Sequence, residues 1–208
     1  SSTRRHTRSG IMSRGLGDVY KRQEEALPHI ERALKLDPLN PFCYHFYGIV
    51  LGYHHRWDDA IAAFRTVLDI EPNFMPALGM MIVALSTKGM YDQALAIIRK
   101  INADDAELIK ALEDGFEKAG YNGAYRAVAD FMAEMYGKPG KNVDNFAIAN
   151  TYNAAGEYEL AMDWLEKCYD EHDPNLPYIG SPQYDSLRSY PRFQDLLRKM
   201  NLPVDEKE

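Results

Sequence analysis

One apolar pattern recurs in this 208-residue chain at an interval of 34 residues. The interval separates four pairs of positions: Ala26 and Ala60, Ile30 and Phe64, Ala33 and Val67, and Pro38 and Pro72. Steps of three and four residues put the apolar members on one face of a helix, and the proline ends that helix because it cannot continue it. A fixed period of this length indicates stacked structural units rather than one irregular core. The sequence therefore predicts consecutive helix pairs.

The stretch before Ala60, PFCYHFYGIVLGYHHR, supplies the first helix of a pair. Its apolar stripe consists of Tyr44, Tyr47, Gly48 and Leu51, and Gly48 removes a side chain where two helices would touch. Two further units show the same organisation at 75–103 and 142–174. Between them lies a stretch of the right length for one degenerate helix pair, broken at the sequence AGYNG. Near the end, YDSLRSYPRFQDLLRKM predicts a helix with a buried stripe of Phe193, Leu196, Leu197 and Met200, which would cap the last repeat.

This frame resembles the tetratricopeptide repeat. The family pattern has large, large, small and aromatic residues on the first helix, then Ala, aromatic, Ala and Pro on the second, and residues 41–74 fit nearly every position. The unit at 75–103 departs from it at Ile82 and at Ala106. The resemblance implies an all-α, right-handed superhelical solenoid of antiparallel helix pairs with a C-terminal capping helix. The expected division is a half-repeat at 24–40, repeats at 41–74 and 75–103, a degenerate pair at 104–138, a repeat at 142–174, and a loop, capping helix and acidic tail at 175–208.

Both ends of the chain carry further resemblances. From Leu176 onward, LPYIGSPQYDSLRSYPRFQDLLRKMNLP resembles the closing segment of tetratricopeptide-repeat domains at the C-terminal end of bacterial multidomain signalling and transcription-regulator proteins. Residues 13–23, SRGLGDVYKRQ, resemble a translated sequencing adapter. We therefore expect residues 1–23 to be a non-native, disordered basic arm, and the natural chain to continue upstream of Glu24.

Charge is distributed unevenly along the sequence. Residues 1–23 contain six Lys or Arg and one Asp, whereas the rest contains 18 basic and 30 acidic residues, a net charge of -12. Such a body repels a polyphosphate backbone, so we expect no nucleic-acid binding by this region. No window approaches the roughly 18 consecutive apolar residues of a membrane helix, which favours a cytoplasmic location without membrane insertion. Cys43 and Cys168 lie in separate apolar helical patterns and are expected to be reduced core thiols.

The histidines and carboxylates of the sequence favour structural roles over catalysis or metal binding. His45, His54 and His55 lie close together, but no Cys or acidic ligand has a matching offset, so a metal site is disfavoured. Carboxylates such as Asp58 and Asp105 occupy helix starts, where they complement the helix dipole. Phosphate-cradling glycine motifs are not found in the sequence. The sequence therefore predicts no catalytic residues, no metal and no cofactor, and a protein that is not an enzyme.

The remaining candidates are first-helix positions turned away from the core. In the tetratricopeptide family these positions line a concave groove. Here the groove-lining candidates are Phe42, His45, Ile49, Tyr53, Val83, Ser86, Phe146, Asn150 and Asn153. Asn side chains can bond a peptide backbone, and aromatic residues often dominate binding energy. The alternative is that these residues pack on neighbouring helices. The family's terminal-carboxylate clamp does not carry over, because His45 and Ile49 stand where it needs Lys, Asn or Arg.

The predicted function is protein–protein interaction, as the C-terminal regulatory or sensory region of a larger bacterial signalling protein. Its partner would be a protein, a peptide, or another domain of the parent chain. A self-assembling homodimer is the alternative, because the half-repeat at 24–40 lacks its first helix and leaves apolar surface uncovered. An enzyme is the least favoured class.

Overall fold

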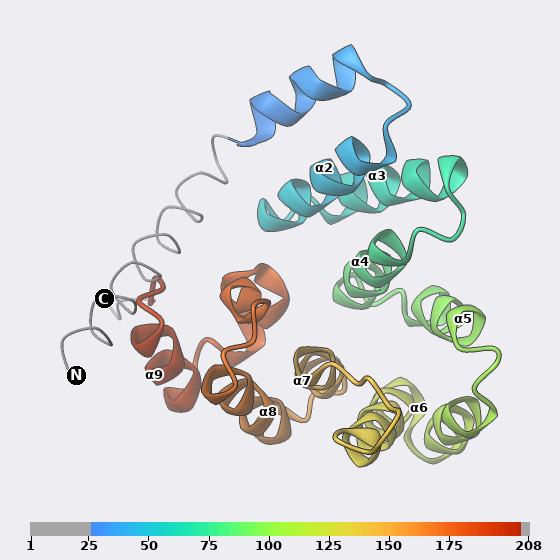
Figure 1. The fold of residues 1–208 in the computed structure, drawn as a ribbon, viewed down its shortest axis with the longest axis vertical. Coiled ribbons are helices and arrows are strands. Elements are labelled where there is room, and N and C mark those ends of the chain that lie inside the picture. Colours follow the sequence, from blue (N-terminus) through green and yellow to red (C-terminus); the bar gives the residue numbers. More distant parts are fainter. Residues whose placement is uncertain (1–25, 205–208) are drawn as a thin grey trace. The chain divides into compact units, whose positions relative to one another are not determined.

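The computed structural model describes residues 26–204, and all regular secondary structure in this range is helical. Residues 26–36 form a first helix. The helices that follow are α2 (Pro41–Tyr53), α3 (Trp57–Ile70), α4 (Met75–Thr87), α5 (Tyr91–Ile101), α6 (Ala106–Met135), α7 (Asn145–Ala154), α8 (Tyr158–Asp170), the 3-10 segments η1 (Leu176–Gly180) and η2 (Pro182–Leu187), and α9 (Pro191–Lys199) (Figure 1). The predicted arm at 1–23 and the end of the acidic tail lie outside the described residues.

The chain forms two compact units. Within the described range, unit 1 comprises residues 26–97, 180–185 and 197–204, and unit 2 comprises residues 98–179 and 186–196. The residues of α2, α3 and α4 therefore belong to unit 1, and those of α6, α7 and α8 belong to unit 2.

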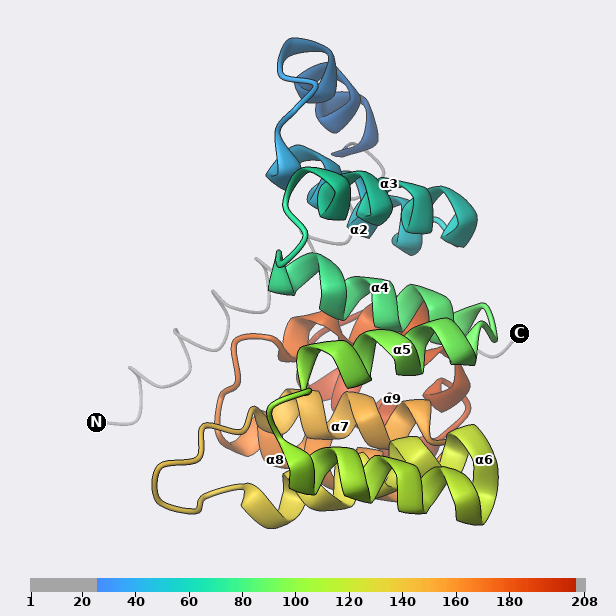
Figure 2. The ribbon, with the colours of Figure 1, turned by 90° about the vertical axis from the view of Figure 1, so that its right-hand side faces the viewer.

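The core of unit 1 is centred on the contact between α2 and α3. Ala60, Phe64 and Val67 on α3 are at most 1% exposed, as the 34-residue pattern predicts. A Cβ built on Gly48 would lie 2.5 Å from Cε1 of Phe64, so the phenyl ring fills the space that the glycine leaves open on α2. Helix α3 also contacts α4, and α2 contacts α4 directly. Figure 2 shows α4 and α5 as the next neighbouring pair.

Local signals set where these helices begin. The Asn40 side chain accepts hydrogen bonds from the backbone N–H groups of Phe42 and Cys43 at 3.0 and 3.3 Å, and Pro41 occupies the first turn of α2. Asp58 and Asp59 lie in the first turn of α3, where carboxylates complement the helix dipole. Asp105 caps α6 by accepting from the N–H of Leu108 at 3.0 Å. The acidic residues singled out in the sequence thus stabilise helix starts.

In unit 2, helix α6 has two halves, and the assignment of residues 104–138 to a degenerate repeat pair stays a prediction. The helix is interrupted at Ala119 and Gly120, where Gly120 adopts a φ of 61°, and the chain folds back there. The two halves cross at Gly115 and Gly123: a Cβ on either one would collide with the carbonyl oxygen of the other. The sequence AGYNG therefore marks a real break, and the paired glycines let two helix backbones touch.

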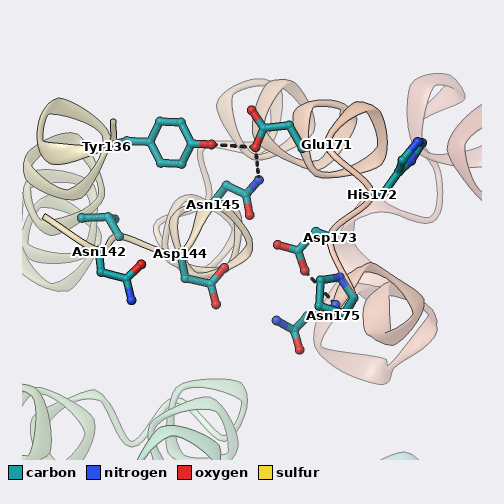
Figure 3. A pocket seen from close by; sticks show the side chains of 10 residues that line it. Tyr136, Asn142, Asp144, Asn145, Glu171, His172, Asp173 and Asn175 are labelled. Atoms are coloured by element: carbon teal, nitrogen blue, oxygen red, sulfur yellow. Dashed lines mark hydrogen bonds between the residues drawn. The ribbon is translucent and has the colours of Figure 1, made fainter. Parts of the chain in front are cut away.

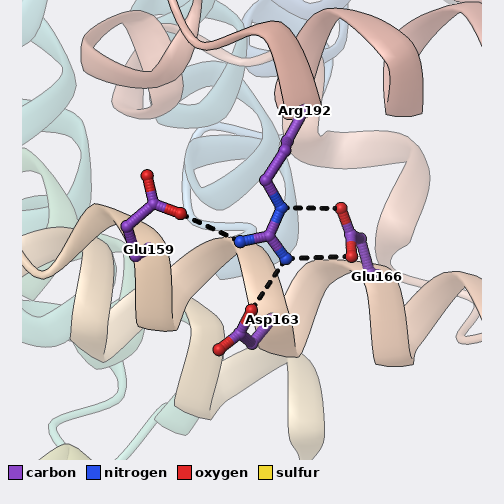
Figure 4. Close-up of polar contacts among 4 residues, drawn as sticks. All are labelled: Glu159, Asp163, Glu166 and Arg192. Atoms are coloured by element: carbon purple, nitrogen blue, oxygen red, sulfur yellow. Dashed lines mark hydrogen bonds and ion pairs between the residues drawn. The ribbon is translucent and has the colours of Figure 1, made fainter.

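Arg192 on α9 makes several ion pairs with α8. The Arg192 guanidinium donates to both carboxylate oxygens of Glu166 at 3.1 and 2.9 Å, to Asp163 at 2.7 Å and to Glu159 at 2.9 Å (Figure 4). These hydrogen bonds raise the pKa of Arg192 further above its ordinary value, first through Glu166 and then through Asp163. These ion pairs thus tie the first turn of α9 to α8.

The expected architecture of antiparallel helix pairs is confirmed. The described residues contain helices and no strands, and successive helices contact one another as α2 with α3, α3 with α4, α6 with α7, and α7 with α8. The predicted stripe of the last helix is also confirmed, because Phe193, Leu196, Leu197 and Met200 are all buried.

Candidate functional site

One side of α2 carries a partly exposed apolar stripe, in which Ile49 also packs against the core and the Phe42 ring lies edge-on to that of Phe74 at 5.1 Å. Phe42, Phe46, Ile49 and Tyr53 follow one another at steps of four, three and four residues, which places them on one face of the helix. Phe42 is 57% exposed and Phe46 is 52% exposed, whereas Ile49 and Tyr53 are half-buried. Exposed aromatic side chains are costly to leave in water and are frequent anchors of protein interfaces.

Helix α4 continues this apolar surface. Because α3 contacts both α2 and α4, and these two also contact each other, their sides opposite α3 form one face. Met75, Gly79, Val83 and Ser86 lie on that side of α4, since the buried side of the helix is formed by Ala77, Leu78, Met81, Ala84 and Leu85. We call the surface formed by Phe42, Phe46, Ile49, Tyr53, Met75, Gly79, Val83 and Ser86 the α2/α4 face. Its most open part is formed by the first turns of the two helices, where Met75 is 56% exposed.

His45, which we expected to line a groove, is buried instead, with only 7% of its surface exposed. Its ring lies 5.4 Å from the ring of Phe74, 5.5 Å from that of Phe46 and 6.0 Å from that of Phe64. Its Nδ1 atom is buried without a hydrogen-bond partner, and burial lowers the pKa of His45 below the ordinary value of 6.5. The imidazole therefore acts as part of the aromatic packing beneath the α2/α4 face.

The buried His45 should make folding sensitive to mild acid. Because its pKa is lowered in the folded state, the unfolded chain takes up a proton more readily as pH falls through 6.5, so stability should decrease there. Urea unfolding measured across this range should show the decrease in wild type and a smaller one in His45→Gln. Equal pH dependence in the two proteins would contradict a neutral, buried His45.

The three groove candidates in unit 2, all on α7, are buried or half-buried. Phe146 is buried, at 8% exposure, whereas Asn150 and Asn153 on α7 are half-buried. The Asn153 side-chain oxygen accepts a hydrogen bond from the Ser186 hydroxyl at 3.3 Å. Of the nine groove candidates, six therefore lie on α2 and α4 and three lie on α7. Their role in binding stays a prediction.

Unit 2 also contains an open pocket of about 430 Å³ that the sequence did not indicate (Figure 3). It is lined by Tyr136, Asn142, Val143, Asp144, Asn145, Glu171, His172, Asp173, Pro174 and Asn175. Glu171 accepts hydrogen bonds from the Tyr136 hydroxyl at 2.6 Å and from the Asn145 amide at 2.8 Å. The bond to Glu171 is the main reason that the pKa of Tyr136 rises to about 12. These contacts join the end of α6 to α7 and α8, which makes them structural links.

The remaining features to consider are the two cysteines, clusters of metal-binding side chains and helices that could cross a membrane. Cys43 and Cys168 are free thiols, and burial raises the pKa of Cys168 to about 12, which keeps it protonated and unreactive. Within residues 26–204, no group of three His, Cys, Asp or Glu side chains is arranged to hold a metal ion. None of the helices in this same range is long and apolar enough to cross a bilayer.

Sequence reasoning missed three members of the α2/α4 face: Phe46, Met75 and Gly79. Phe46 follows Phe42 by four residues, so extending the stripe by one helical turn would have found it. Gly79 gives no such signal, because a glycine has no hydropathy that marks a face. Phe46, Met75 and Gly79 are all exposed.

Packed helix pairs with a 34-residue period define a helical-repeat protein. Comparison with known families agrees with this class. Residues 54–113 match one tetratricopeptide-repeat model, and residues 145–171 match a second. The chain therefore contains tetratricopeptide repeats in these two segments, and repeats of this type serve in general as protein–protein interaction modules. The comparison with curated proteins gave no match.

Proposed function

We propose that this protein binds a partner protein or peptide through the α2/α4 face. The observation that carries the proposal is the pair of aromatic side chains, Phe42 and Phe46, which are more than half exposed on a helix whose other residues include the buried Gly48 and Leu51. Burying two phenyl rings against a partner recovers apolar area that folding leaves in water. The tetratricopeptide-repeat matches support the general role.

In the cell, we propose a cytoplasmic regulatory or sensory region at the C-terminal end of a larger bacterial signalling protein. The support for this context is the closing segment from Leu176, which resembles the end of such domains. The partner is then another protein or another domain of the same parent chain. The acidic body disfavours nucleic acid as the ligand.

Selection of binding peptides provides the test. A displayed library of random short peptides is selected against the wild-type protein, and the enriched peptides are measured against Phe46→Gln. We expect affinity to fall about tenfold or more, because aromatic anchors often contribute most of the binding energy. Tyr178→Gln is the matched control, since Tyr178 is 51% exposed and lies in unit 2. Equal binding by Phe46→Gln and wild type would place the site elsewhere.

Self-association is the second candidate, and a separate observation favours it. Leu36 and Leu39 are 80% and 74% exposed at the end of the first helix, so they offer apolar surface for a second copy. If they form a dimer, sedimentation should show a mass that rises with concentration. Leu36→Gln together with Leu39→Gln should return the protein to a monomer. A wild-type protein that stays monomeric at all concentrations rules out this candidate.

A further inference from the structure

Gly79 is a glycine whose position is not explained by packing within the chain. Gly48 faces Phe64, and Gly115 faces Gly123. A Cβ on Gly52 would lie 3.0 Å from the Trp57 ring, so all four of these glycines avoid close contacts. At Gly79, by contrast, nothing lies within 4 Å of the place that a Cβ would occupy. The other glycines with similarly open surroundings, Gly120, Gly137, Gly140 and Gly156, all need a positive φ, which Gly79 does not have.

The position is unfavourable for the isolated helix. Gly79 lies inside α4, away from both ends, and among the helix-forming residues glycine ranks just above proline. Any other small residue would fit there and would stabilise the helix. Glycine also allows another molecule to approach a backbone closely, which is its usual use where a ligand contacts the main chain.

The surroundings of Gly79 are apolar. Met75 lies one turn before it and Val83 one turn after it on α4, and the exposed rings of Phe42 and Phe46 lie on the neighbouring α2. The missing side chain therefore leaves an opening in an otherwise apolar surface. A large apolar side chain from outside would find apolar neighbours there on both helices.

The same face is also uncharged. Residues 41–53 and 75–87, which form α2 and α4, contain no Lys, Arg, Asp or Glu. The second helices of these pairs differ: α3 contains Asp58, Asp59, Arg65 and Asp69, and α5 contains Asp92, Arg99 and Lys100. A charged ligand would lose hydration on this face without gaining an opposite charge, whereas an uncharged ligand would lose little.

We infer that the α2/α4 face binds an uncharged, apolar segment of a partner protein, with one large side chain seated over Gly79 and held between Phe46 and Val83. The inference rests on the proposed function and specifies the chemistry of the partner. It also assigns Gly79 a role in ligand binding rather than in folding.

The test uses peptides selected against the full chain from a random displayed library. We expect the enriched peptides to contain large apolar residues and few charges, and their affinity to stay nearly constant as salt is raised, because ion pairs contribute little. Gly79→Gln, which fills the opening, should weaken binding about tenfold or more. Ala96→Gln, the same side chain on an exposed position of α5, should bind like wild type.

Thermal melting separates a blocked site from a damaged fold. Gly79→Ala and Gly79→Gln should melt at or above the wild-type temperature, because both residues favour helix more than glycine does. Loss of binding in Phe46→Gln but not in Gly79→Gln overturns this inference and leaves the proposed function intact. Loss in neither variant overturns both, as does a selection that yields no binding peptide. Charged peptides whose affinity falls steeply with salt also overturn the inference.

Discussion

Gly115→Leu should destabilise the protein by about 3 kcal/mol, at the upper end of the usual cost of overpacking. The reason is that Gly115 faces the backbone of Gly123, so the new side chain would collide with a carbonyl oxygen. A side-chain neighbour could rotate away, but a helix backbone cannot, and the two halves of α6 would have to separate. Urea unfolding at equilibrium measures the effect through the shift in midpoint.

Ala106→Leu is the control for this variant. Ala106 is the first residue of the same helix and is exposed, so the added side chain meets solvent. We expect it to change stability by less than about 0.5 kcal/mol, as surface substitutions usually do. If Gly115→Leu unfolded at the same urea concentration as this control, the close crossing of the two halves of α6 would be disproved.

Phe64→Ala should cost about 3–5 kcal/mol, the range found when a fully buried phenylalanine is truncated. The ring is 1% exposed, and it occupies the space beside Gly48 on α2 while also contacting the His45 ring. Removing it leaves a cavity that a glycine backbone cannot fill. The loss should be seen in the urea midpoint and in the melting temperature.

A second substitution distinguishes a cavity from a general loss of structure. Gly48→Ala alone should lower the free energy of unfolding, because the new Cβ would overlap the Phe64 ring. In a protein that already carries Phe64→Ala, the same Gly48→Ala change should lower it much less. Phe46→Ala serves as the exposed control, with a small effect on stability. Additive effects of the Gly48 and Phe64 changes would mean that the two residues do not touch.

The period of the sequence predicted the packed faces well. Ala60, Phe64 and Val67 recur in a fixed frame because each helix pair must bury the same side against the next, so their burial follows from spacing alone. The break in α6 was also visible, because AGYNG combines two glycines with Tyr and Asn, which form helix less readily than Ala or Leu.

Features that depend on contacts between distant residues escaped prediction. Gly115 and Gly123 meet only because the chain reverses at Gly120, and Asn145 reaches Glu171 from another helix. Periodicity predicts an open surface for His45, because it gives a helical face but cannot tell whether a neighbouring ring, here that of Phe74, covers the residue. These outcomes depend on tertiary geometry that no local pattern encodes.

The attachment of α9 restricts which residue can occupy position 192. Three carboxylates, on Glu159, Asp163 and Glu166, are satisfied together because a guanidinium is flat and offers several N–H groups in fixed directions. Lysine has the same charge but concentrates it on one small ammonium group, which cannot reach all three acids with this geometry. Lysine at position 192 would therefore not preserve all of these contacts. A positive charge alone is insufficient to hold the first turn of α9 against α8.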